Sequence, residues 1–300
     1  MATTSTALTG TPAASRSRRP RGALAQAARV FAHDRQAMLG LVIIAIIGGA
    51  ALAAPLISPW DPLTSASVER LSPIGTPGHL LGTDEQGRDI LSRLIWGGRA
   101  SLLVGILPTV TAGVVALGLG LLAGYLGGLV DHVIMRALDV FFAFPLVLLA
   151  IAIVGVIGPG MGNQMFALAV VLVPYSTRVV RTAALSVKPL EYVEAARALG
   201  ASGGRLVGRH LLPNVLPPLL VYTSTLVGLM IVASAGLSFL GLGVQPPTPD
   251  WGVMVGNGRL VLYRAAHVAT IPGVVIVVAA LAFNFVGDGL REALDPRARR

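Results

Sequence analysis

The stretch EAARALGASGGRLVGRHLLP, residues 194–213, is polar and arginine-bearing, and it lies between two long apolar runs. Pro189 upstream can occupy the first turn of a helix. Glu191 and Glu194 suit the positive end of the helix dipole, and Gly200 can close the helix. Together these signals predict a helix of about ten residues and about 15 Å.

The predicted helix has one apolar face. Its members follow the spacing i, i+3, i+4, i+7 of a helix stripe and are Tyr192, Ala195, Ala196 and Leu199. The two alanines keep this face low, so another surface can approach it closely. A helix of this kind is suited to binding by a partner protein. The alternative is an amphipathic helix that rests on the membrane surface between two spans.

The composition indicates an integral membrane protein. Hydrophobic residues make up 54% of the chain, charged residues 12%, and the mean hydropathy is +0.76. A soluble domain has about a quarter of its residues charged. Because one span needs about 20 apolar residues, the long charge-free runs accommodate several spans. Turn residues at Gly158-Pro159-Gly160 divide the longest run into two.

We therefore predict an all-α, polytopic membrane protein with six transmembrane helices. The Pro217-Pro218 and Pro246-Pro247 pairs are taken as the limits of the fifth. The predicted helices lie near residues 37–57, 101–124, 134–156, 165–180, 216–240 and 268–288. Gly120 and Gly124 form a small-xxx-small pair that allows close helix packing within the second.

Charge predicts the orientation of the helices. Lys and Arg are enriched in short cytoplasmic segments, and most of the 23 basic residues fall on one side if the amino terminus is cytoplasmic. Both termini and residues 182–213 are then cytoplasmic. We predict a mostly disordered tail over residues 1–35. A cleaved signal peptide ending near Ala51-Leu52-Ala53 is the alternative, but the apolar run is long for a signal core.

Several chemistries are excluded or disfavoured. The only lysine, Lys188, follows Val187, so the Gly-Lys of a phosphate-binding P-loop is missing. We predict no enzyme activity and no cofactor on this chain. It has no cysteine, and its five histidines show no close ligand pair, so no metal site is predicted. The net charge of +9 is spread over loops without a nucleic-acid-binding motif, so nucleic acid is not an expected partner.

Two acidic residues fall inside predicted spans. Asp139 and Asp288 are the default candidates for an ion path. We expect them instead to pair with nearby Arg136 and Arg291 as structural anchors. This interpretation disfavours an ion-coupled secondary transporter.

The spacing of the opening stretch resembles a known family. Glu194-Ala195-Ala196, Gly200 and the end of the loop at Leu212-Pro213 match the EAA loop of ABC importer permeases. The pattern usually has isoleucine where this chain has His210. The resemblance implies that the loop docks, as a helix, into a groove on an ATP-hydrolysing subunit.

Further stretches are similar to the C-type permease subunit of the dipeptide, oligopeptide and nickel ABC importer family. They are GTDEQGRDILSRLIWGGRASLLVG (82–105), ALDVFFAFPLVLLAI (137–151), SFLGLGVQPPTPDWG (238–252) and GDGLREALDPR (287–297). The resemblance covers residues 36–297 and implies the type I importer permease fold. It divides the chain into a basic tail (1–35), a first span and extracytoplasmic loop (36–99), a core permease domain (100–290) and a cytoplasmic end (291–300).

The resemblance implies a function and a set of partners. The chain would form half of a translocation pore for oligopeptides or dipeptides, with nickel as the alternative substrate. The implied partners are a homologous permease in a heterodimer, two ATP-binding subunits or domains that hold ATP and Mg, and an extracytoplasmic binding protein. The implied location is a bacterial-type inner membrane, in contact with lipid.

A mixed-charge cluster before the second predicted span suits an outer salt-bridged collar, a surface for a charged partner, or a solvated loop that fixes the entry to the helix. Trp251, in the next outer loop, can lie at the membrane interface. The resemblance implies that the extracytoplasmic binding protein docks near these loops. The candidate contact residues are Asp84, Arg88, Asp89, Arg93 and Trp251.

Overall fold

A computed structural model describes residues 21–65 and 69–294 of the chain. Its helices are α1 (Arg21–His33), α2 (Arg35–Leu52), α3 (Ala54–Ile57), α4 (Ile90–Leu126), α5 (Gly128–Phe142), α6 (Leu146–Ile157), α7 (Met161–Val187), α8 (Glu191–Ala198), α9 (Gly203–Leu206), η2 (Val207–Leu211), α10 (Leu212–Phe239), α11 (Trp251–Gly258), η3 (Arg259–Val261) and α12 (His267–Leu294). The predicted tails at residues 1–20 and 295–300 lie outside the described residues. Residues 21–33 are helical as α1, so the prediction of disorder was wrong for them.

Within residues 21–65 and 69–294, five helical stretches are long and apolar enough to cross a membrane. They are α2, α4, α7, the continuous stretch α9–η2–α10 and α12. The pair α5 and α6 passes the same test when taken together, although its two halves are bent by 88°. Counted as one span, this pair gives the six that the sequence predicts.

The bend corrects the predicted straight helix at 134–156. Pro145 precedes α6, and its ring disfavours helical geometry at the residue before it, Phe144. The helix therefore ends at Phe142 and starts again at Leu146. The signal for the bend, Pro145 after Phe144, lies within an apolar run whose length by itself predicts one helix.

Other boundaries also differ from the prediction. α4 begins at Ile90, because the Asp89 carboxylate accepts a hydrogen bond from the Ser92 N–H at 2.7 Å and caps the helix. The predicted boundaries at 99/100 and 290/291 therefore fall inside α4 and α12. Pro217 and Pro218 lie inside α10 and do not limit it, as is tolerated in membrane helices.

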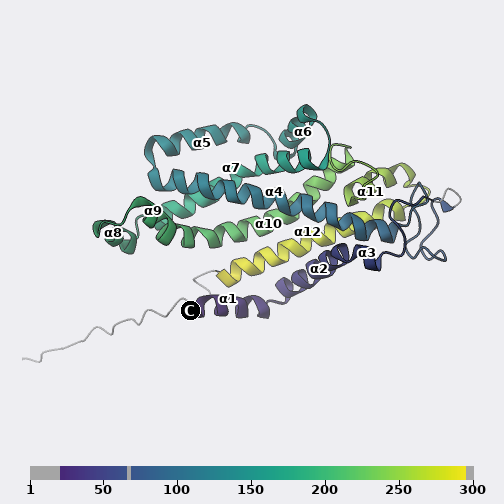
Figure 1. Cartoon of the computed structure of the whole chain (residues 1–300), viewed down its shortest axis with the longest axis horizontal. Helices are drawn as coiled ribbons and strands as arrows, with labels where there is room; N and C mark the ends of the chain where they lie inside the picture. The colour runs from purple at the N-terminus through teal and green to yellow at the C-terminus, as the bar shows by residue number, and fades with distance from the viewer. Residues whose placement is uncertain (1–20, 66–68, 295–300) are drawn as a thin grey trace, which may run out of the picture.

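The bundle has two different ends (Figure 1). At one end lie α8 and α9, and at the other lie α3, α11 and the loops between the spans. α4 packs against α7 and α10, whereas α12 packs against α10 and α2. One buried apolar cluster lies at the α8 end; it includes Leu121 of α4, Val180 of α7, Val193 of α8 and Val215 of α10. This cluster connects the short helices to the spans.

Glycines set the separation of α4 and α7. A Cβ on Gly120 would lie 2.5 Å from Val180 and 2.9 Å from the Thr177 carbonyl, and one on Gly124 would lie 2.6 Å from Ala184. Only glycine permits this approach, as the Gly120-xxx-Gly124 pair predicted.

We predict that Gly120→Ala destabilises the protein by about 1–3 kcal/mol, because an added methyl group must displace α7. Thermal unfolding in detergent would show this as a lower Tm. Gly118→Ala is the matched control on the same helix, since a Cβ there meets nothing within 4 Å. Equal Tm values for the two variants would contradict the close-packing argument.

Candidate coupling site

α8 ends as the sequence predicts. Gly200 has a φ of +83°, which a side chain rarely adopts. The Gly200 N–H donates to the Arg197 carbonyl at 2.9 Å, and the Ala201 N–H donates to the Ala196 carbonyl at 3.0 Å. This pair of bonds is a Schellman motif, in which glycine after the helix satisfies the last carbonyls.

The predicted apolar face of α8 is divided by the structure. Val193, which the prediction omitted, is fully buried, and Ala196 is half-buried beside it. Tyr192 and Ala195 are exposed, and 89% of Leu199 is accessible. α8 therefore attaches to its own chain through Val193 and presents Tyr192, Ala195, Leu199 and the nearby carboxylate of Glu194 outward.

The segments before and after α8 contact the end of α4. The Lys188 ammonium donates to the Tyr125 carbonyl at 2.7 Å, where it satisfies a terminal carbonyl of α4. A Cβ on Gly203 would lie 2.8 Å from the Tyr125 hydroxyl oxygen, so this ring lies against the start of α9. Tyr125 could not be identified from the sequence, because its partners Lys188 and Gly203 are remote in the chain.

The end of the loop continues into α10. Leu212 is the first residue of α10, and Pro213 is the second. The preceding segment, η2, is a π-helical turn that carries His210. The imidazole of His210 packs against the Tyr192 ring, with centroids 5.9 Å apart.

At the other end of the molecule, the predicted charged contact surface is buried. Asp84, Arg88, Asp89 and Arg93 are each at most 6% exposed. The Arg88 Nε donates to the Asp84 carboxylate at 2.7 Å, and the Arg93 Nη1 donates to the Pro62 carbonyl at 3.1 Å. In this structure the four side chains therefore present almost no surface to a partner. They hold the loop against α4.

Trp251 is also buried, with 1% of its surface exposed. Its indole N–H donates to the Leu94 carbonyl at 2.9 Å, and its ring lies against Gly97 and Gly98 of α4. The ring is therefore packed inside the protein and is not exposed to lipid as a membrane anchor. The exposed apolar side chains of this loop follow it, at Leu260, Leu262 and the fully exposed Tyr263.

Two carboxyl groups at the end of the bundle opposite α8 have raised pKa values. Burial raises the pKa of Asp250, which accepts hydrogen bonds from the Ser101 hydroxyl and the Gly252 N–H. Partial burial also raises the pKa of Glu85, which lies 3.2 Å from the Arg88 guanidinium in the loop before α4. The bond from Ser101 to Asp250 joins the loop before α11 to α4.

In the loop before α4, His79 lies between two carboxylates. Its Nδ1 lies 3.0 Å from Asp89 and its Nε2 lies 3.1 Å from Glu69, while its ring stacks on Trp60. Burial lowers the pKa of His79, but the hydrogen bonds to Asp89 and Glu69 outweigh this effect and raise the pKa above its usual value of 6.5. The protonated ring can donate to both carboxylates.

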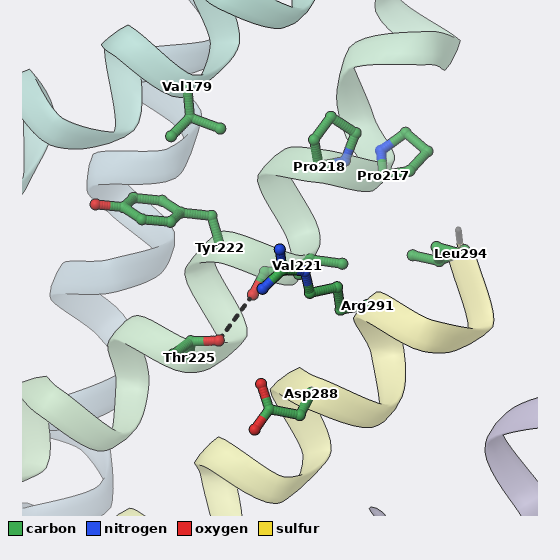
Figure 2. Close-up of a pocket in the computed structure, with 9 residues that line it drawn as sticks. All are labelled: Val179, Pro217, Pro218, Val221, Tyr222, Thr225, Asp288, Arg291 and Leu294. Atoms are coloured by element: carbon green, nitrogen blue, oxygen red, sulfur yellow. Dashed lines mark hydrogen bonds between the residues drawn. The ribbon is translucent and has the colours of Figure 1, made fainter. Parts of the chain in front are cut away.

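The acidic residues of the spans have different partners from those predicted. Asp139 pairs with Arg178 of α7 at 2.6 Å, and not with Arg136. Within the described ranges, neither Asp288 nor Arg291 forms an ion pair. Both instead line a cleft of about 650 Å³ between α7, α10 and α12 (Figure 2). Its other lining residues are Val179, Pro217, Pro218, Val221, Tyr222, Thr225 and Leu294.

Comparison with known proteins identifies the class and then the family. A methionine ABC transporter, MetNI, solved in an inward-facing conformation, has a chain that superposes with a TM-score of 0.57 at 22% identity. The match covers 69% of this chain and 98% of that chain. The fold is that of a type I ABC importer permease.

Residues 116–300 match the family described as binding-protein-dependent transport system inner membrane component. Residues 23–73 match the N-terminal transmembrane domain of oligopeptide transport permease C. The chain belongs to this family and is a multi-pass inner membrane permease of an ABC importer.

Two relatives cover nearly the whole chain. Glutathione transport system permease protein GsiD of Pectobacterium atrosepticum is 41% identical, over 90% of each chain. Di/tripeptide transport system permease protein DppC of Pseudomonas aeruginosa is 43% identical, also over 90% of each chain.

The geometry of His79 predicts a pH-dependent stability. Because its pKa is raised in the folded state, its contribution is fully present below the unfolded pKa and is lost as the pH rises through the folded pKa. We expect the Tm to fall from mildly acidic to mildly alkaline pH, and His79→Gln to flatten this dependence. His132→Gln, at an exposed histidine bonded to its own helix, should leave the slope unchanged. An unaltered slope in His79→Gln would refute the assignment.

Proposed function

We propose that this chain forms half of the translocation pore of an importer for dipeptides or oligopeptides. The relatives are named for glutathione and for di- and tripeptides, all short peptides or close analogues of them. These names favour a peptide over nickel. The family membership disfavours an ion-driven transporter that works alone.

The observation that carries the coupling role is the exposed face of α8. Tyr192, Ala195 and Leu199 form an apolar surface at one end of the bundle. Such a face suits a helix-in-groove contact. Glu194 is exposed beside it and is available to a basic residue of the partner. Ala196 and Gly200 complete the coupling helix, and Leu212 and Pro213 end the coupling loop.

The complete importer would contain four kinds of component: this chain, a homologous second permease, two ATP-binding subunits or domains, and an extracytoplasmic binding protein. ATP and Mg would bind to the ATP-binding subunits, and this chain would bind no cofactor. Both termini and the loop at 182–213 would be cytoplasmic, in line with the distribution of basic residues.

We assign the binding-protein contact to a surface other than the predicted one. Leu260, Leu262 and Tyr263 are exposed. They come shortly after α11, which lies at the end of the bundle opposite α8 (Figure 1). Arg259 and Arg264 lie on either side of them in the sequence. An aromatic anchor between two arginines has the composition of an interface hot spot.

Gly200→Asp tests the coupling role. The added side chain conflicts with the φ of +83° and adds a charge beside the docking face, so we expect uptake of a labelled dipeptide to be lost while membrane insertion is retained. Gly204→Asp is the matched control in the same loop, since a Cβ there meets nothing within 4 Å and its φ is not positive. Normal uptake in Gly200→Asp would exclude the proposed role.

Deletion of the chain tests the substrate class. We expect cells without it to lose uptake of labelled dipeptide or glutathione and to retain uptake of labelled nickel. The tagged wild-type chain, purified in mild detergent, should be recovered with a second permease and ATP-binding subunits. Loss of nickel uptake alone would replace the peptide assignment.

A further inference from the structure

Three side chains join α8 to the start of α10. Tyr192 of α8 packs its ring against the imidazole of His210 in η2, with an interplanar angle of 43°. The Asn214 amide of α10 donates to the Tyr192 hydroxyl at 3.3 Å. The same amide donates to the His210 carbonyl at 2.6 Å. One amide therefore holds both the aromatic ring of α8 and the backbone of the π-helical turn.

The contact lies at the end of a long rigid element. α9, η2 and α10 form one continuous helical stretch from Gly203 to Phe239. His210 lies in this stretch at the turn where hydrogen bonding changes from the α to the π pattern. Turns of this kind are frequent at functional sites in helices.

The other connections of α8 are short and less directional. Val193 is buried against Leu206, Leu211 and Val215, a contact that resists separation but has little orientational preference. The links in the chain pass through residues 188–190 and 199–202. Rotation of α8 about the buried Val193 is therefore opposed chiefly by the ring contact and by the hydroxyl bond.

We propose that Tyr192, His210 and Asn214 form a clamp, which makes α8 and the helix Gly203–Phe239 move as one body. The clamp rests on the proposed function, because it matters only if ATP-binding subunits displace α8. It makes the three residues positioning residues for coupling: they transmit the displacement of α8 to α10. His210, which replaces the isoleucine usual in the EAA pattern, supplies the ring that Tyr192 packs against.

His210→Ala in the complex purified through the tagged chain tests the clamp. The complex is reconstituted in vesicles with the binding protein, and peptide uptake and ATP hydrolysis are measured together. We expect ATP hydrolysis to continue and the peptide transported per ATP to fall severalfold, because the displacement of α8 is no longer transmitted fully to α10. Tyr192→Phe, which keeps the ring and loses the hydroxyl bond, should lower the ratio less.

Two observations separate the clamp from the proposed function. His132→Ala, at an exposed histidine outside the coupling site, should keep the wild-type ratio. A wild-type complex without ATP-binding subunits, or one that does not couple hydrolysis to peptide uptake, would overturn the proposed function. A coupled wild type with an unchanged ratio in His210→Ala would overturn the clamp alone.

A cross-link provides a second and independent test. The natural chain has no cysteine, so Tyr192→Cys with His210→Cys introduces the only pair of thiols on this chain. The unlinked double variant should show the low ratio of His210→Ala, and a short thiol-specific cross-linker should restore the ratio. Linked complexes, verified by mass spectrometry, that hydrolyse ATP without improved uptake would show that α8 must move relative to α10, and would overturn the proposal.

Discussion

The contact between α4 and α7 supports the α8 end of the bundle. Gly120 and Gly124 let the two helices approach so closely that a methyl group at either position would overlap with α7. Their ends are consequently adjacent, so Lys188 after α7 can satisfy the Tyr125 carbonyl at the end of α4. Tyr125 then lies against Gly203 at the start of α9. This close packing therefore positions the ends of α4 and α7 against which α8 and α9 pack.

The two ends of the bundle use charge in opposite ways. At the end opposite α8, Asp84, Arg88 and Arg93 are buried and form ion pairs. Loss of one partner from such a group would leave a buried, unpaired charge, which strongly destabilises the fold. The loop there is consequently held to α4 as a fixed structure. At the other end, Glu194 and the apolar face of α8 are exposed. An exposed face on a helix that is packed against the spans through Val193 suits a contact with another protein.

The sequence predicted the features that depend on local chemistry. Composition predicted the membrane class, the turn at 158–160 separated two spans, and Gly200 marked the end of α8 because its conformation depends on one residue. Features that depend on tertiary neighbours were missed. A run of charged residues looks solvated, and only the fold shows that Asp84 and Arg93 are buried. Asp139 was expected to pair within its own helix, whereas Arg178 comes from a helix remote in sequence.

The clamp and the cleft occupy neighbouring turns of the same helix. Asn214, at the start of α10, donates a hydrogen bond to the Tyr192 hydroxyl. Pro217 and Pro218 line the cleft about one turn farther along the helix. The opposite walls of the cleft come from Val179 of α7 and from Asp288 and Arg291 of α12 (Figure 2). A body that contains both α8 and α10 therefore carries one wall of the cleft with it. If the proposed clamp holds, displacement of α8 would change the separation of Pro218 from Val179 and Arg291, and the cleft between the spans would change shape with it.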